Sequence, residues 1–286
     1  MSLRGIPARR GLALRRPPKR RSFRVARVFD APWFWGLVGF GVILGVWVFI
    51  NETGLAEEFV LPAPWAVAER MVEIRGALLQ AMWDTAFVCL VGFACGLAVG
   101  IALALAMHFS PRFNRAIKPT LVASQTVPLL ALAPVLVLWF GFTIVPKLII
   151  VSLLVFFPIT MNMADGLRST SPELRSFARS LGASRLDILR YCEIPSALPQ
   201  LFTGVRIAAT YTVIAAIIAE WVNGQSGLGA LMLRANFSFE TEVVFATVIL
   251  MVVLGVAFYV GAVGLERLVI PWHAKRHQTR ASSRRH

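Results

Sequence analysis

Residues 171–199 read SPELRSFARSLGASRLDILRYCEIPSALP, a polar stretch inside an otherwise apolar chain. Ser171 followed by Pro172 is a typical helix start, because a serine hydroxyl caps the first turn and proline suits the first helical position. Gly182, ten residues later, allows a sharp bend in the backbone. The first half of the stretch therefore predicts a short helix that ends at a glycine.

The second half of the stretch predicts another short helix. Ser184 with Asp187 three residues later has the spacing of a capping box. Pro195 and Pro199 are expected to end the unit, because proline interrupts a helix. Two short helices joined at a glycine form a structured loop, and we expect a membrane protein to present such a loop to a soluble partner.

The composition places the chain among integral membrane proteins. Of its 286 residues 57% are hydrophobic, and its mean hydropathy of +0.69 is too high for one soluble domain. The net charge is +14, but ten of the 29 basic residues lie in the first 27 positions. This tail is best interpreted as an anchor on anionic membrane lipid, so we expect no nucleic-acid partner. The cysteines and histidines lack metal-ligand spacing, and no metal site is expected.

Six stretches are apolar and long enough to cross a bilayer, which takes about 20 residues. They are residues 33–50, 84–107, 121–141, 147–165, 204–222 and 243–265. Pro128 and Pro134 interrupt the third stretch, although prolines are tolerated where neighbouring helices satisfy the freed carbonyls. One bent hairpin that dips into the membrane and returns is the alternative for the third and fourth stretches.

The basic residues predict the orientation. With six spans, most Lys and Arg residues of the loops and both tails fall on one side, while the other side has Arg70, Arg75, Lys147, Arg234 and most of the glutamates. Because basic residues mark the cytoplasmic side, both termini are expected there. The predicted organisation is a basic cytoplasmic tail (1–32), a transmembrane domain (33–272) with the polar loop 171–199, and a second basic cytoplasmic tail (273–286).

The second predicted span carries Gly92, Gly96 and Gly100 at four-residue spacing. Small residues on one face of a helix let another helix approach closely. These glycines are therefore expected to pack against a neighbouring span.

Several catalytic motifs are missing from the chain. It has no G-x-x-x-x-G-K-[ST] phosphate loop, so it is not expected to hydrolyse ATP alone. The glycine-rich residues 224–229 fall on the outer side and are interpreted as a flexible turn. With no nucleophile or metal motif either, the chain is not predicted to be an enzyme.

Polar residues inside the spans are candidates for a translocation path, because such residues are costly in a membrane. The candidates are Gln125, Asn162, Tyr211, Thr212 and Glu220. Hydrogen bonds between helices explain Gln125 and Asn162 equally simply. Glu220 fits either a gate, a contact to a docked protein or a carboxylate near the membrane surface.

The loop resembles the EAA-x3-G-x9-I-x-L-P motif of the inner-membrane subunits of bacterial ABC importers. Ala178, Gly182, Ile194 and Pro195 stand at its second Ala, Gly, Leu and Pro. The sequence departs from the motif at three positions: Ser176, Phe177 and Cys192 replace its Glu, first Ala and Ile.

Residues 126–162, 204–209, 220–229 and 266–272 extend the resemblance to the nitrate/sulfonate/taurine-type permeases, over roughly residues 61–272. The resemblance implies an all-α, type I importer permease in the bacterial inner membrane. It implies a homodimer, an ATPase subunit that binds ATP and Mg, and a soluble or lipid-anchored substrate-binding protein. It also implies that the loop forms coupling helices, with Leu174, Phe177, Ala178, Arg179, Gly182, Ala183, Arg185, Ile194 and Pro195 as the residues concerned.

The resemblance predicts import of a small solute: nitrate, a sulfonate, taurine, or a vitamin precursor such as the thiamine pyrimidine or riboflavin. A stand-alone secondary transporter or channel is the alternative, and it leaves the helical loop without a role. A further alternative gives the arginines of the loop, Arg175 included, the task of holding it on the cytoplasmic side.

Overall fold

The computed structural model describes residues 32–272 except 56 and 58, and it falls into two units, the first of which ends at Leu55. The described part of the first unit contains α2 (Pro32–Glu52), which covers the first expected span. The second unit contains α3 (Pro64–Glu73), α4 (Arg75–Phe109), α5 (Pro111–Ser124), α6 (Leu129–Phe140), α7 (Val145–Arg168), α8 (Pro172–Ser180), α9 (Arg185–Ile188), the π-helical turn η1 (Leu189–Glu193), α10 (Ile194–Asn223), α11 (Leu228–Phe237) and α12 (Thr241–Val269). The described residues contain no strand, which confirms the all-α class.

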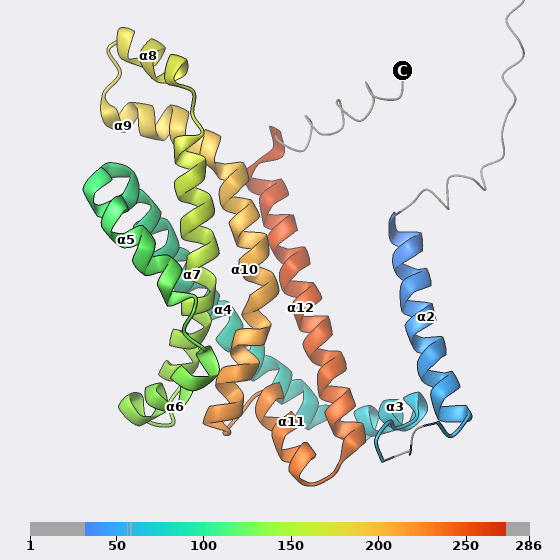
Figure 1. Ribbon diagram of the computed structural model, residues 1–286. Coiled ribbons are helices and arrows are strands. Elements are labelled where there is room, and N and C mark those ends of the chain that lie inside the picture. Colours follow the sequence, from blue (N-terminus) through green and yellow to red (C-terminus); the bar gives the residue numbers. More distant parts are fainter. Residues whose placement is uncertain (1–31, 56, 58, 273–286) are drawn as a thin grey trace, which may run out of the picture. The chain divides into compact units, whose positions relative to one another are not determined.

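Four helices of the second unit are long and apolar enough to cross a membrane (Figure 1): α4, α7, α12, and the continuous helical run Arg185–Asn223 that ends in α10. These four helices contain the second, fourth, fifth and sixth expected spans. The basic tail expected at 1–32 lies outside the described residues up to residue 31, and the tail expected at 273–286 lies outside them entirely.

The third expected span, 121–141, is not one straight helix. The chain forms α5 and α6, which meet at a 99° bend. Pro128 is the N-cap of α6 with an extended backbone (ψ 114°), and Gln125 ends α5. A proline disfavours helical geometry in the residue before it, so the helix breaks ahead of Pro128. Only together are α5 and α6 long and apolar enough to cross a membrane, and they would then form one bent span.

The core of the second unit is built around α7, which packs most extensively against α4 and α10. On the α4 side, a Cβ atom added to Gly96 would lie 2.8 Å from Val155 Cβ and 3.0 Å from the backbone oxygen of Ser152. Gly92 and Gly100 meet Val151 and Ile159 at similar distances. The two helices therefore approach so closely that these positions have no room for a methyl group.

The start of α10 differs from the sequence expectation. Pro195 and Pro199 do not end the helical loop, because α10 begins at Ile194 and runs through both. Pro195 stands in the first turn, where its missing N–H costs no hydrogen bond. The π-helical turn η1 lies directly before α10, so the hydrogen-bond pattern of the α-helix is already interrupted there. The helical loop thus continues without a break into a membrane-crossing helix.

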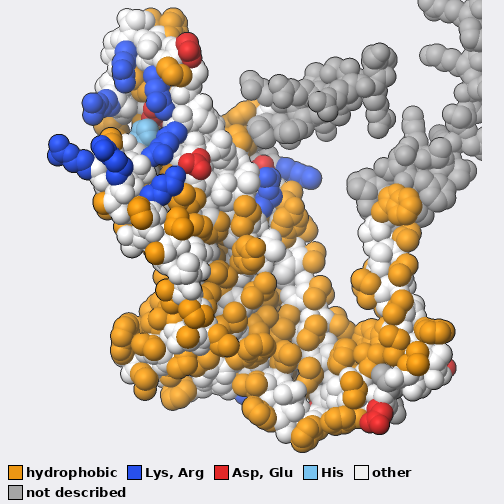
Figure 2. Space-filling model, in the orientation of Figure 1, with side chains coloured by type: hydrophobic (Ala, Val, Ile, Leu, Met, Phe, Trp, Pro, Cys, Tyr) orange, Lys and Arg blue, Asp and Glu red, His pale blue; other side chains and the backbone are white. Residues whose placement is uncertain are grey.

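Most of the basic residues that Figure 2 shows in the second unit gather toward one end. Figure 2 shows Lys and Arg side chains around α5, α8 and α9, whereas apolar side chains cover most of the visible face elsewhere. At the opposite end, Arg70 of α3 forms ion pairs with Glu73 (2.7 Å) and with Glu240 (2.9 Å), which stands before α12. Arg70 donates hydrogen bonds to both carboxylates, and these bonds, the one to Glu73 first, raise the pKa of Arg70 above its ordinary value.

Candidate functional site

The helical loop (residues 171–199) has both of the capped helices that its sequence suggests. Ser171 Oγ accepts a hydrogen bond from Leu174 N (3.2 Å) and caps α8. Ser184 Oγ accepts one from Asp187 N (3.2 Å), while Asp187 Oδ2 accepts one from Ser184 N (3.0 Å), which completes a capping box at α9. These caps satisfy backbone donors locally, so the loop keeps its shape without a partner.

The bend between the two helices depends on Gly182. Its φ is +79°, a conformation that L side chains rarely adopt, and the space around its Cα is open. Gly182 N donates to Arg179 O (3.0 Å), and Ala183 N donates to Ala178 O (3.1 Å). A glycine is therefore required here by backbone conformation and not by close packing.

One face of α8 is apolar and uncovered. Leu174, Phe177 and Leu181 are 42%, 62% and 72% exposed, and α8 has no buried residue. Ala178, on the same face, is half-buried. We call these four residues the apolar ridge. Exposed apolar side chains on a polar, capped loop are typical of a surface that another protein covers.

The remaining motif residues of the loop divide between its surface and its base. Ala183 is half-buried at the bend between α8 and α9, and Ile194 and Pro195 are half-buried at the start of α10, where the loop joins the bundle. Arg179 and Arg185 are exposed, and neither guanidinium group has a hydrogen bond or ion pair within the described residues. Both guanidinium groups are thus available to a partner or to lipid phosphate.

Arg175 is turned inward, unlike Arg179 and Arg185. Its Nε lies 2.9 Å from Glu193 Oε1, and its Nη2 donates to Leu167 O (3.0 Å) at the end of α7. The second oxygen of Glu193 lies 2.8 Å from His108 Nε2 at the end of α4. We call Arg175, Glu193 and His108 the inner cluster.

The inner cluster connects the helical loop to the bundle. The Glu193 side chain is only 7% exposed, and a carboxylate buried to this extent needs charged or hydrogen-bonding partners. It receives them from α8 and α4, two elements that are 67 residues apart at Arg175 and His108. Because the partners are distant in sequence, no local pattern predicts this cluster.

The candidate path residues do not come together at one site. Gln125 and Tyr211 are exposed, whereas Thr212 is fully buried and donates to Ala208 O (2.7 Å) in its own helix. Asn162 also bonds within its helix, from Nδ2 to Pro158 O (2.8 Å), and not to another helix. A single copy of the chain therefore shows no continuous polar path through these residues.

Glu220 is fully buried, so in this structure other helices cover its carboxylate and a docked protein has no access to it. Its carboxylate accepts hydrogen bonds from Thr85 Oγ1 on α4 (2.9 and 3.1 Å) and from Gly229 N (2.8 Å). Leu228 N donates in turn to Thr85 Oγ1 (2.8 Å). This set of contacts, the outer cluster, joins α4 and α10 to the first turn of α11.

The glycine-rich turn 224–229 is held in place by the outer cluster, in contrast to the flexible turn expected. Gly227 has φ +105°, and a Cβ atom there would lie 2.1 Å from Glu220 Oε1. The Gly229 backbone reaches the same carboxylate. Gly227 and Gly229 are thus required by close approach to Glu220.

Comparison with known proteins connects this arrangement to a family. Residues 96–271, more than half of the chain, match the model of the binding-protein-dependent transport system inner membrane component family. The match includes the helical loop, all three residues of the inner cluster, and the glycine-rich turn. The helical loop and the inner cluster therefore lie within the part of the chain that the family shares, whereas Thr85 of the outer cluster lies before it.

Individual relatives match over most of their length. The chain is 35% identical to the formylaminopyrimidine transport permease protein ThiX of Halalkalibacterium halodurans, covering 82% of this chain and 94% of that protein. It is 34% identical to the riboflavin transport system permease protein RibX of Chloroflexus aurantiacus, over 84% and 92%. It is 32% identical to the putative aliphatic sulfonates transport permease protein SsuC of Escherichia coli, over 88% and 95%.

A solved structure shares the fold. Inward-facing conformations of the MetNI methionine ABC transporter match 69% of this chain and 98% of the compared chain, with a TM-score of 0.59 and 18% identity. Together with the family match and the apolar helices, this similarity fits a multi-pass protein of the plasma membrane with a type I permease fold. The chain belongs to the family of binding-protein-dependent transport system inner membrane components.

Proposed function

We propose that the chain is the membrane-spanning subunit of an ATP-driven importer, which passes a small solute from a binding protein outside the cell to the cytoplasm. A separate ATPase subunit, with its ATP and Mg, supplies the energy, because the chain has no phosphate-loop motif of its own. The family match supports the importer class.

The observation that best supports an ATPase partner is the exposed apolar ridge, which lies on a loop whose two helices are both capped within the chain. The ridge gives an ATPase an apolar surface to cover, and Arg179 and Arg185 flank it with unpaired positive charge. The inner cluster and the unbroken run from α9 into α10 link movement of the ridge to the spans. Rigid-body switching between inward- and outward-open states needs such a link.

We propose further that the working permease is a homodimer. Gln125 and Tyr211, two of the candidate path residues, are exposed on the single chain. A second copy facing them would enclose a path that one copy lacks.

The solute we propose is a vitamin precursor with a heteroaromatic ring. The relatives named for formylaminopyrimidine and riboflavin transport are 35% and 34% identical to this chain, slightly above the 32% of the sulfonate relative. The binding protein is expected to supply most of the selectivity.

The test is reconstitution of the chain in vesicles with the ATPase and the binding protein encoded beside it. We expect uptake of formylaminopyrimidine or riboflavin that requires ATP inside the vesicles and the binding protein outside. Arg179→Glu combined with Arg185→Glu should release the ATPase in a pull-down. Arg75→Glu, at the start of α4 and far from the helical loop, should not release it. Uptake by the chain alone, driven by an ion gradient, would contradict the proposal.

A further inference from the structure

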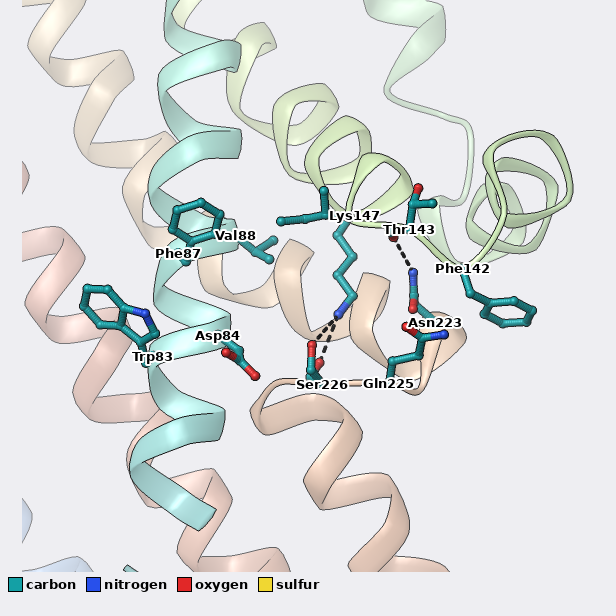
Figure 3. A pocket seen from close by; sticks show the side chains of 11 residues that line it. Trp83, Asp84, Phe87, Val88, Phe142, Thr143, Lys147, Asn223, Gln225 and Ser226 are labelled. Atoms are coloured by element: carbon teal, nitrogen blue, oxygen red, sulfur yellow. Dashed lines mark hydrogen bonds between the residues drawn. The ribbon is translucent and has the colours of Figure 1, made fainter. Parts of the chain in front are cut away.

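A cavity of about 350 Å³ lies at the end of the bundle opposite to the helical loop (Figure 3). It is formed by α4, the segment between α6 and α7, the first turn of α7, and the turn between α10 and α11. Since α10 runs on from the end of the helical loop at residue 199 to Asn223, about 36 Å of helix separates the cavity from the loop. In the proposed importer this end faces the binding protein.

The cavity contains a buried cation with spare hydrogen-bonding capacity. Lys147, in the first turn of α7, is only 4% exposed. Its Nζ donates to Ser226 O (3.0 Å) and to Ser226 Oγ (3.3 Å). An ammonium group has three donors, so one remains for another acceptor. No carboxylate of the described residues lies within 4.0 Å of Nζ.

A carboxylate lines the same cavity from another helix. Asp84 on α4 is half-buried, and its Oδ1 accepts a hydrogen bond from Gln80 Nε2 (3.0 Å). Its Oδ2 has no hydrogen bond within the described residues. Figure 3 shows the Asp84 and Lys147 side chains reaching from α4 and α7 into the space beside Ser226. The cavity thus has a charged donor and a charged acceptor, each with hydrogen-bonding capacity left over within the described residues.

Aromatic side chains complete the lining. Trp83 and Phe87 of α4 and Phe142 before α7 border the cavity, and Trp83 and Phe142 are 66% and 60% exposed. The volume is at the lower end of the range for small-molecule sites, roughly 300 to 1,000 Å³. By contrast, the cavity between α4 and α12, lined by Leu90, Phe93 and Leu254 among others, has no charged side chain. Its character suits contact with lipid or another helix.

We propose that the cavity is a contact site for the solute at the outer mouth of the permease, with Lys147 as donor and Asp84 as acceptor. The ligand class is a small flat heterocycle that has a ring nitrogen or carbonyl acceptor and an amino donor. Asp84 repels a simple anion while Lys147 attracts it, so the pair together favours a ligand that has both an acceptor and a donor. The assignment rests on the proposed function and adds a site within it.

The test is protection of a cysteine at the cavity from labelling. Gln225 is exposed and lines the cavity, so Gln225→Cys is introduced into a chain with Cys95→Ser and Cys192→Ser, which leaves only the buried Cys89. The complex with ATPase and binding protein is labelled with a membrane-impermeant maleimide. Formylaminopyrimidine at about twice its dissociation constant should slow labelling about three-fold by mass action.

Variants separate contact from general effects on the structure. Asp84→Asn and Lys147→Met should each remove the protection, and Asp84→Asn carries the test if Lys147→Met does not fold. Arg75→Cys, at the same end of the bundle but outside the cavity, should label at one rate with and without solute. Riboflavin and taurine serve as the larger and the non-aromatic probes.

The outcomes distinguish this site from the proposed function. Unprotected labelling in a complex that imports the pyrimidine with ATP would overturn the site and leave the importer intact. Protection by taurine alone, or equal protection in both variants, would also overturn it. Absence of ATP-dependent uptake by the wild-type complex would instead overturn the proposed function.

Discussion

The helical loop and the contact between α4 and α7 use opposite kinds of packing. In the loop, Phe177 and Leu181 are 62% and 72% exposed and touch little of their own chain. Between α4 and α7, Gly96 leaves no room for a Cβ atom against Val155. The difference fits the proposed importer, in which the bundle moves as one closely packed body and another protein covers the outer surface of the loop.

The strongest test of this comparison is to force α4 and α7 apart. Gly96→Leu should abolish the folded chain, at a cost of about 3 kcal/mol or more, because the clash involves the Val155 side chain and the Ser152 backbone. Size-exclusion chromatography in detergent measures the loss. Gly255→Leu on α12, where an added Cβ meets nothing within 4 Å, is the matched control and should elute normally.

The outer cluster provides a second test of rigidity in the bundle. Glu220→Ala leaves Gly229 N without its acceptor, and a buried donor left unpaired costs about 1 to 3 kcal/mol, whereas Thr85 Oγ1 keeps Ala81 O as an acceptor. We expect a clearly lower thermal unfolding temperature in detergent. Glu69→Ala, an exposed carboxylate on α3, should leave it unchanged. Equal unfolding temperatures for both variants would show that the contacts of Glu220 do not stabilise the bundle.

The inner cluster tests the link between the two regions. Glu193→Gln weakens the contacts to Arg175 and His108, at about 2 kcal/mol because both partners are partly exposed. Uptake should fall while ATP hydrolysis and ATPase binding persist, since the apolar ridge itself is unchanged. Glu173→Gln, an exposed residue of α8, is the control. Parallel loss of uptake and ATPase binding would contradict a role in transmission.

The bend of the loop gives the smallest effect on stability. Gly182→Val places a β-branched residue at φ +79°, which strains the backbone by roughly 1 to 2 kcal/mol without a steric clash. The protein should remain inserted and elute normally, but uptake should be lost because α8 and α9 are reoriented. Ser180→Val, at the end of α8, is the control. Wild-type uptake by Gly182→Val would remove the bend from the mechanism.

The sequence predicted the features that depend on near neighbours. The caps at Ser171 and Ser184 and the bend at Gly182 are local, and the structure has all three. Pro195 misled because proline both ends helices and begins them, and only the preceding π turn decides between the two. The proline at position 128 predicted an interruption of the third stretch, but the 99° angle between α5 and α6 depends on tertiary packing.

The buried clusters were beyond sequence reasoning. Glu220 was recognised as a polar residue in a span, yet its partner Thr85 lies 135 residues away. Glu193 and Lys147 stood beside helix ends, where charged residues are ordinary. Their burial became visible only when distant helices were placed together, so the inner cluster and the Lys147 cavity had no local pattern to reveal them.

The central claim is that the apolar ridge of α8 is the surface that an ATPase covers. The direct measurement is photo-cross-linking from a benzophenone amino acid at position 177 in the assembled complex, with position 83, at the other end of the bundle, as the control. We expect a cross-link to the ATPase from position 177 and none from position 83. An importing complex that gives no ATPase cross-link at position 177 would contradict it.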